Sequence, residues 1–214
     1  MKKLLRLLAA PLFAATLALT AFTSPARADT PESDAELALQ WQTAWDTYKF
    51  YDTAPPVPGV GRSRDTAQIS IQINAPVQRV FAKYSIISNH IGRAAFLKRV
   101  VTHKEWCRRD IRYINFTAIE DIPYQGTIVT SKTHAQQRIH QEDLYYETDT
   151  WSEPNVVTHQ KIVFKKLPGG TTQVTEHLTF EADASLIDFV VTNGVASHQQ
   201  TQAGLKAAIE TGAL

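Results

Sequence analysis

The sequence predicts an α+β fold in which a seven-stranded antiparallel sheet packs against one long C-terminal helix. Isoleucine alternates with polar residues from Ile69 to Ile73, which is the period-two pattern of a half-buried strand. Six more strand-like runs with turns between them follow from residue 97 to 181, and helical periodicity then extends from about 184 to 210. Consecutive antiparallel strands form a meander, and the helix must bury its apolar side against them.

The chain begins with the features of a secretory signal peptide. Three cationic residues precede an apolar run at 7–22, and Ala26-Arg27-Ala28 has the form of a cleavage site. These sixteen apolar residues fall short of the ~20 that a membrane-spanning helix needs, which favours a signal over an anchor. We therefore expect cleavage after Ala28 by the general secretory route, and a periplasmic or secreted protein of residues 29–214.

Charge and cysteine content limit the classes of function. The formal net charge of the chain is +1, and residues 1–28 carry four cationic and no acidic side chains, so the remainder is at about −3. A mildly acidic domain has no electrostatic footprint for nucleic acid or for an anionic membrane. Cys107 is the single cysteine, so no internal disulfide forms, and its strand pattern predicts a half-buried thiol.

Residues 29–52 predict an N-terminal amphipathic helix. Ser33 with Glu36 three residues later forms a capping box, and an apolar stripe follows at helical spacing. The stripe consists of Leu37, Trp41, Ala44, Tyr48 and Tyr51. It would either cap the main domain or dock a partner. Three prolines and two glycines then make 53–66 a linker, so the main domain is expected at 67–212.

The main domain begins with a strand that leads straight into a helix. Pro76 follows the strand at a position where a first helical residue tolerates a missing N–H. Val77, Val80, Phe81 and Tyr84 then give a short amphipathic helix, with another turn or short helix at 88–94. The expected strands are 97–106, 110–119, 126–134, 138–150, 156–166 and 172–181. Asp183 is expected to cap the last helix, which ends near Gly212.

These features resemble the START-like superfamily, also called SRPBCC. The stretch Ala75-Pro76-Val77-Gln78-Arg79-Val80-Phe81 after the first strand, and GGTTQVTEHLTFE at 169–181, carry the resemblance, which covers about 67–210. The superfamily includes birch-pollen-allergen, polyketide cyclase and dehydrase, and lipid-transfer types. The resemblance implies a helix-grip fold, a curved sheet wrapped around the C-terminal helix. It also implies a cavity between them, closed at one end by the two short helices.

The C-terminal helix itself favours such a cavity. Its two ends are apolar, but residues 193–202 are small or polar, and Gly194 costs about 1 kcal/mol of helix stability against alanine. Such a middle fits a helix that passes a cavity or its mouth. Alternatively, the polar residues face solvent and Gly194 allows close packing on the sheet.

The last strand predicts an inward-facing carboxylate. Val174, Glu176, Leu178 and Phe180 share one face by period-two counting, and the apolar members should face the helix. An inward Glu176 needs a partner or a raised pKa. The candidate ligand-binding residues are Glu176, Gln160, Asn193 and His198, with Tyr113, Phe116, Tyr146, Phe164 and Phe180 as aromatic lining or ordinary core.

No motif in the sequence points to a metal, a cofactor or a defined catalytic residue. The seven histidines lack the spacing that places two ligands on one face, although His134 and His140 are expected to flank a hairpin. No phosphate loop, dinucleotide fingerprint or nucleophile elbow is present.

Three functions remain open. The first is a secreted START-like domain that binds a hydrophobic small molecule or lipid in the cavity. The second is a cyclase or dehydrase-type enzyme that uses an inward acid or base, with Glu176 or His198 as candidates. The third is a non-enzymatic module that docks a partner through the aromatic stripe of the N-terminal helix.

Overall fold

The structure is a computed structural model that describes residues 32–94, 96–124 and 126–214. The predicted signal peptide at 1–28 lies outside the described residues and stays a prediction. None of the helices within the described ranges is both long enough and apolar enough to cross a bilayer.

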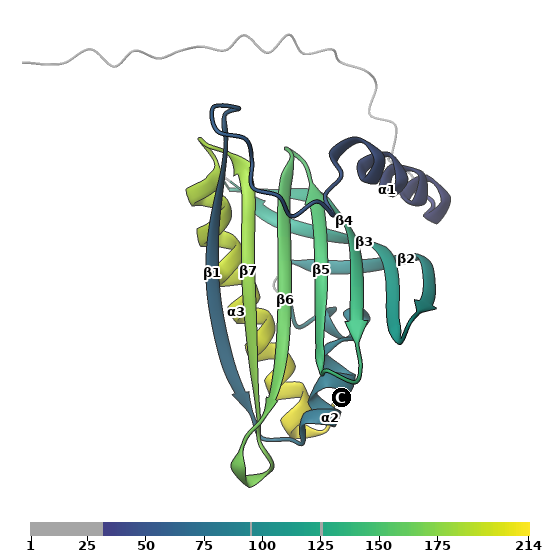
Figure 1. Cartoon of the computed structure of the whole chain (residues 1–214), viewed down its shortest axis with the longest axis vertical. Coiled ribbons are helices and arrows are strands. Elements are labelled where there is room, and N and C mark those ends of the chain that lie inside the picture. Colours follow the sequence, from purple (N-terminus) through teal and green to yellow (C-terminus); the bar gives the residue numbers. More distant parts are fainter. Residues whose placement is uncertain (1–31, 95, 125) are drawn as a thin grey trace, which may run out of the picture. The chain divides into compact units, whose positions relative to one another are not determined.

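Seven antiparallel strands form one sheet in the order β1-β7-β6-β5-β4-β3-β2 (Figure 1). Each strand pairs with its neighbour in sequence, except that β1 returns to pair with β7. The elements are α1 (Asp34–Tyr48), β1 (Arg62–Ile73), α2 (Val77–Tyr84), η1 (Ile87–His90), β2 (Leu97–Arg108), β3 (Ile111–Tyr124), β4 (Thr127–His140), β5 (Tyr145–Ser152), β6 (Val156–Lys166), η2 (Pro168–Gly170), β7 (Thr172–Asp183) and α3 (Ile187–Thr211). The predicted α+β helix-grip fold is therefore confirmed.

The inner face of the sheet carries the main core. Figure 1 shows α3 running along one face of the sheet behind β1, β7 and β6. Alternate residues of the strands, such as Ile73, Ile162 and Val174, point to this face and are fully or almost fully buried. They pack against Leu205 and Ile209 in the C-terminal half of α3, and against α2.

Several strand boundaries differ from the prediction, and β3 continues to Tyr124 where the sequence predicted its end at 119. The β4–β5 turn lies at 141–144, not near 135–137, so His134 and His140 are both on β4 and do not flank a hairpin. The polar pair Gln136-Gln137 resembles a loop in sequence, but both side chains are buried. Gln136 donates to Asn115 of β3, and Gln137 donates to the carbonyl of Ser85 at the end of α2. Strand β1 begins at Arg62, inside the segment 53–66 expected to be a linker, because Arg62 pairs with Asp183 of β7.

The start of α3 also differs. The helix begins at Ile187 with Leu186 at its N-cap, and no side chain caps it. Asp183 instead accepts hydrogen bonds from the backbone N–H and hydroxyl of Ser185, which closes the turn after β7. The helix ends as predicted, with Gly212 in the left-handed conformation.

The outer face of the sheet is partly covered by α1. The capping box forms as predicted between Ser33 and Glu36. Trp41 is 5% exposed, and its indole Nε1–H donates to the carbonyl of Ala135 at 2.8 Å. Since the centre of the stripe is buried against this domain, Trp41 is not available to a partner. Tyr48 stacks on Trp151 and keeps 43% of its surface exposed.

The single cysteine is less buried than its pattern predicted. Cys107 is exposed near the end of β2, at the hairpin that joins β2 to β3. The register places it opposite Arg112. The hairpin extends the two strands into solvent, so alternation along β2 does not bury either face there.

Gly194 lies where α3 crosses Phe180 of β7. A Cβ at position 194 would come within 2.5 Å of a ring carbon of Phe180, a contact that requires the buried ring to move. We expect Gly194→Ala to lower the free energy of unfolding by about 1–2 kcal/mol, because overpacking outweighs the gain in helix propensity. Chemical denaturation would measure the change.

Thr192→Ala is a matched control for that substitution. Thr192 is exposed on the same helix. We expect it to be neutral or slightly stabilising, because alanine has the higher helix propensity. Equal stability of Gly194→Ala and the wild type would contradict close packing at this crossing.

Candidate functional site

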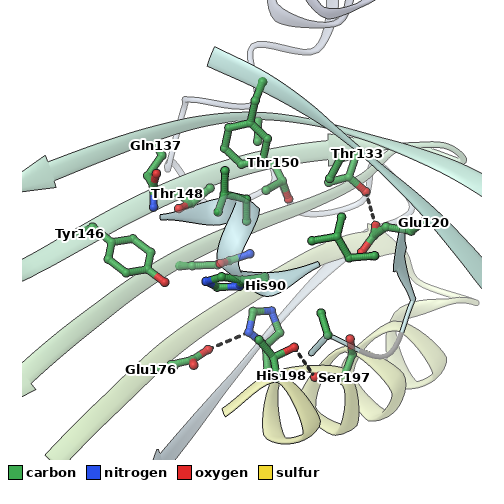
Figure 2. A pocket seen from close by; sticks show the side chains of 18 of the residues that line it. His90, Glu120, Thr133, Gln137, Tyr146, Thr148, Thr150, Glu176, Ser197 and His198 are labelled. Atoms are coloured by element: carbon green, nitrogen blue, oxygen red, sulfur yellow. Dashed lines mark hydrogen bonds and ion pairs between the residues drawn. The ribbon is translucent and has the colours of Figure 1, made fainter. Parts of the chain in front are cut away.

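A cavity of about 130 Å³ lies between the inner face of the sheet, α3 and the segment around η1 (Figure 2). The strands contribute Phe116, Ala118 and Glu120 of β3, Thr133, Ala135 and Gln137 of β4, Tyr146, Thr148 and Thr150 of β5, Gln160 of β6 and Glu176 of β7. From the helical side come Tyr84, Ile87, His90, Ala94, Ser197, His198 and Thr201, and Leu97 of β2 completes the lining. Most of these side chains are polar.

The strand residues reach the cavity because of simple alternation. On β3, β4 and β5 the lining residues are two apart, as expected for one face of a pleated sheet. The register places Thr148 opposite Gln137 and Thr150 opposite Ala135. A row of threonines and glutamines therefore faces the helix where a solid core would carry aliphatic side chains.

An ion pair between Glu176 and His198 forms the side of the cavity next to α3. The imidazole Nδ1–H of His198 donates to Oε2 of Glu176 at 2.7 Å. Burial alone would lower the pKa of His198, but its hydrogen bond to Glu176 and the charges of Glu176 and Glu120 outweigh burial and raise that pKa. Burial likewise would raise the pKa of Glu176, but the hydrogen bond and charge of His198 hold it below its usual value. Both directions favour the charged pair.

Glu176 is fully engaged by its neighbours. Its side chain is almost completely buried, and Oε1 accepts hydrogen bonds from the Tyr84 hydroxyl at 2.5 Å and from Nε2 of Gln202 at 3.0 Å. Burial and the charge of Glu176 raise the pKa of the Tyr84 hydroxyl, which therefore stays protonated and donates. Glu176 thus orients His198 and has little capacity left for a ligand.

His198 is the member of the pair that can contact a ligand. Its side chain keeps 24% of its surface accessible, and His198 lines the cavity. Figure 2 shows the ring standing between Glu176 and the interior of the cavity. Because Nδ1 is bonded to Glu176, the protonated imidazole offers its Nε2–H to the cavity.

His90 and Glu120 add two further titratable groups. His90 Nε2 lies 2.8 Å from the carbonyl of Tyr84, which can only accept, so Nε2 carries the proton. Burial lowers the pKa of His90, which leaves the ring neutral with Nδ1 as an acceptor. Glu120 accepts from the Thr133 hydroxyl at 2.7 Å, and burial raises the pKa of its carboxyl.

The structure brings together five of the nine residues proposed from the sequence. Glu176, His198, Gln160, Phe116 and Tyr146 line the cavity.

The other four lie elsewhere. The amide of Asn193 donates to the carbonyl of Phe189 on the exposed side of α3. Tyr113 stacks on Trp106 on the outer face, because its odd number on β3 places it opposite to Phe116. Phe164 packs against Phe81 and Tyr84 in the core, and Phe180 packs against the N-terminal half of α3.

Sequence reasoning missed several lining residues. Glu120, His90, Gln137, Thr148 and Thr150 all face the cavity. Period-two counting from Tyr146 would have placed Thr148 and Thr150 on the same face. Gln137 depends on a strand boundary that no local pattern signals. The sequence predicts a turn or short helix at 88–94, but its pattern does not show that His90 faces the cavity.

A shallow surface depression adjoins the cavity. It is lined by Ile91, Gly92, Arg93, Lys98 and Gln200, and it shares Ala94 and Leu97 with the cavity. Ala94 and Leu97 therefore separate the cavity from the surface. Within the described ranges, no group of three or more histidine, cysteine or acidic side chains is arranged to hold a metal ion.

Comparison with known proteins supports the fold. No family model matches the chain, and no curated protein matches it. Among solved structures it resembles TTHA0849 from Thermus thermophilus, with a TM-score of 0.54 and 14% identity over 70% of this chain and 100% of that one. It also resembles a START superfamily protein from Mycobacterium smegmatis, with a TM-score of 0.54 and 10% identity over 68% and 97% of the two chains.

A third similar structure is an enzyme. The Zhui aromatase/cyclase from Streptomyces sp. R1128 has a TM-score of 0.52 and 10% identity over 69% of this chain and 96% of that one. These likenesses show that the chain has the START-like fold that the sequence resembles. At this level of identity they assign no activity.

Proposed function

We propose that this chain binds a small organic molecule in the cavity between the sheet and α3, with the imidazolium of His198 as its main polar contact. The observation that carries the proposal is the Glu176–His198 pair. A buried carboxylate holds a charged imidazole that lines the cavity, and its Nε2–H has no hydrogen-bond partner among the described residues. Charge-assisted hydrogen bonds of this type are about twice as strong as neutral ones. Oriented polar groups that fix the position of a bound molecule are typical of ligand sites.

The size and lining of the cavity favour a small molecule over a lipid. Its volume of about 130 Å³ is well below the ~300–1,000 Å³ of sites for drug-sized ligands. An apolar cavity of ~150 Å³ binds benzene, so a cavity of this size holds a ligand of about one ring. The row of threonines and glutamines would also leave polar groups unpaired beside an acyl chain. We therefore propose a ligand of about one ring that carries oxygen or nitrogen.

An acid–base enzyme of the cyclase or dehydrase type is the second candidate. It is favoured by the presence in one cavity of a charged His198 and of Glu120, whose carboxyl has a raised pKa. His198 would protonate or polarise a ligand carbonyl, and Glu120 would exchange a proton with the ligand. A solved aromatase/cyclase shares the fold, which is an argument from analogy only.

We also propose that the protein acts outside the cytoplasm after cleavage at Ala28. The support is the pattern of residues 1–28 alone. Mass measurement of the protein recovered from the periplasm or medium of its host would test this. A chain that retains residues 1–28 in the cytoplasm would contradict it.

The binding proposal is tested by native mass spectrometry of protein purified from its own host, followed by solvent extraction. We expect a small molecule bound one to one. We expect His198→Gln to weaken its binding roughly ten- to hundredfold, the loss of a charged hydrogen bond.

Asn193→Ala is the control, since Asn193 contacts the Phe189 carbonyl and does not line the cavity. Binding unchanged in His198→Gln would contradict the proposed contact. Turnover of the extracted molecule, abolished in His198→Gln and in Glu120→Gln, would favour the enzyme.

A further inference from the structure

One buried hydrogen-bond acceptor in the cavity wall has no partner in the part of the chain that the structure describes. Gln137 is 3% exposed, and its Nε2 donates to the carbonyl of Ser85 at 3.1 Å. A carbonyl can only accept, so this bond fixes the orientation of the amide. Its Oε1 is buried and has no hydrogen-bond partner among the described residues. Leaving a buried acceptor unpaired is costly, so such a group in a cavity wall points to a ligand.

Two hydroxyl groups accompany this acceptor at the same end of the cavity. Thr148 lies directly opposite Gln137 in the β4–β5 register, and Tyr146 lies opposite Ile139, two residues further along. Burial raises the pKa of the Tyr146 hydroxyl, so it stays protonated. Neither hydroxyl makes a side-chain hydrogen bond within the described part of the chain. Figure 2 shows the Tyr146 hydroxyl directed into the cavity.

The second carboxyl group of the cavity, that of Glu120, lies at the other end. Glu120 bonds Thr133, which is four residues from Gln137 on β4, or about 13 Å along a strand. The oxygens of Glu176 already accept from Tyr84, His198 and Gln202. The end formed by Gln137, Tyr146 and Thr148, called here the amide end, therefore provides no free counter-charge for a cation.

The chemistry of the amide end matches a hydroxyl group. A ligand hydroxyl has one proton for Gln137 Oε1 and lone pairs for the Tyr146 or Thr148 hydroxyl. A ketone only accepts, which would leave Oε1 unpaired. An ammonium group would bring a buried charge without a free partner.

We propose that the amide end is a hydroxyl-recognition subsite, and that the ligand is an alcohol or phenol whose hydroxyl binds Gln137. This rests on the proposed function, since it assumes that the cavity binds a small molecule. Gln137 is then a specificity-determining residue, while His198 contacts the other side of the same ligand.

The test is an NMR titration of residues 29–214 with phenol and with toluene, two probes that have the same number of heavy atoms. We expect the wild type to bind phenol at least tenfold more tightly than toluene. We expect Gln137→Leu to reduce this preference at least tenfold, the equivalent of one hydrogen bond of about 1.4 kcal/mol.

Asn193→Ala, on the exposed side of α3 and outside the cavity lining, is the matched control and should keep the preference for phenol. If Gln137→Leu does not fold, Tyr146→Phe removes a single hydroxyl and should reduce the preference severalfold.

The outcomes separate this inference from the binding proposal. Equal binding of phenol and toluene by the wild type, or a preference unchanged in both variants, would overturn the hydroxyl subsite and leave cavity binding intact. A co-purified ligand without a hydroxyl would do the same. Binding of neither probe, together with the absence of any co-purified molecule, would overturn both.

Discussion

Replacing Glu176 by alanine is expected to lower the free energy of unfolding by about 3–5 kcal/mol, the usual cost of removing one partner of a buried ion pair. Glu176 is 2% exposed, and its carboxylate accepts hydrogen bonds from Tyr84, His198 and Gln202. Alanine would leave an uncompensated imidazolium and two unpaired donors at the centre of the domain. Equilibrium unfolding in urea at pH 7 would measure the loss.

Two further variants serve as a control and as a test of the ion pair. Thr175→Ala changes the neighbouring residue, whose hydroxyl bonds Ser70 on the exposed face, and should cost little. The double variant Glu176→Leu/His198→Leu removes both charges and should be more stable than Glu176→Ala, since apolar replacement of a whole pair is close to neutral. A double variant less stable than the single one would contradict the account of an ion pair.

This expectation differs from what the sequence suggested for Glu176. Strand alternation predicts that its side chain turns inward, and an inward carboxylate bordering a cavity would be expected to bind the ligand. The structure shows a carboxylate whose oxygens are occupied by neighbouring side chains. Under the proposed function, Glu176 therefore acts on a ligand through His198. The partners come from α2 and α3, which are distant in sequence, so no local pattern could reveal them.

The order of elements was predictable because each follows from local chemistry. The capping box of α1, the proline before α2 and the glycine after α3 all lie where their backbone preferences place them. The sequence-based predictions fail where tertiary packing, and not local sequence, determines the secondary structure. Gln136 and Gln137 resemble a loop but are held in β4 by Asn115 and by the Ser85 carbonyl.

The rotation of side chains around α3 explains why His198 lines the cavity as predicted and Asn193 does not. Asn193 and His198 are both polar residues in the middle of the helix, and composition alone cannot separate them. They are five residues apart, which rotates the side chain by about 140° at 3.6 residues per turn. His198 therefore faces the cavity, whereas Asn193 faces outward. The packing of Gly194 on Phe180, together with that of Leu205 and Ile209 in the main core, fixes this rotation.

The stability of the domain is expected to fall as the pH decreases from about 6.5 to about 4, and His134 should be a main cause. Burial, followed by the nearby His103 and Lys132, lowers the pKa of His134 to about 4. The ring is stacked on Trp151, with ring centroids 5.9 Å apart, and Nδ1 lies within hydrogen-bonding distance of the Thr117 hydroxyl, at 2.9 Å. In the unfolded chain the pKa would be about 6.5.

The sign of the effect follows from proton uptake. Between these two pKa values the unfolded chain binds a proton that the folded chain does not, so acid favours unfolding. Each pKa unit is worth about 1.4 kcal/mol, which gives a loss of about 3 kcal/mol on reaching pH 4. His198 acts in the opposite direction. Its pKa is raised, so the stability it contributes is present below about pH 6.5 and is lost at higher pH.

Comparison of variants isolates the contribution of His134. His134→Phe keeps an aromatic ring against Trp151 and removes the titration, so its free energy of unfolding should fall by about 3 kcal/mol less than that of the wild type between pH 7 and pH 4. Thr117→Val removes the hydrogen bond to Nδ1 but leaves the ring buried, and should keep the steep dependence, because burial is the first cause of the shift. Urea unfolding at a series of pH values would measure all three proteins. Parallel curves for His134→Phe and the wild type would mean that another group, such as the buried His90, controls acid unfolding.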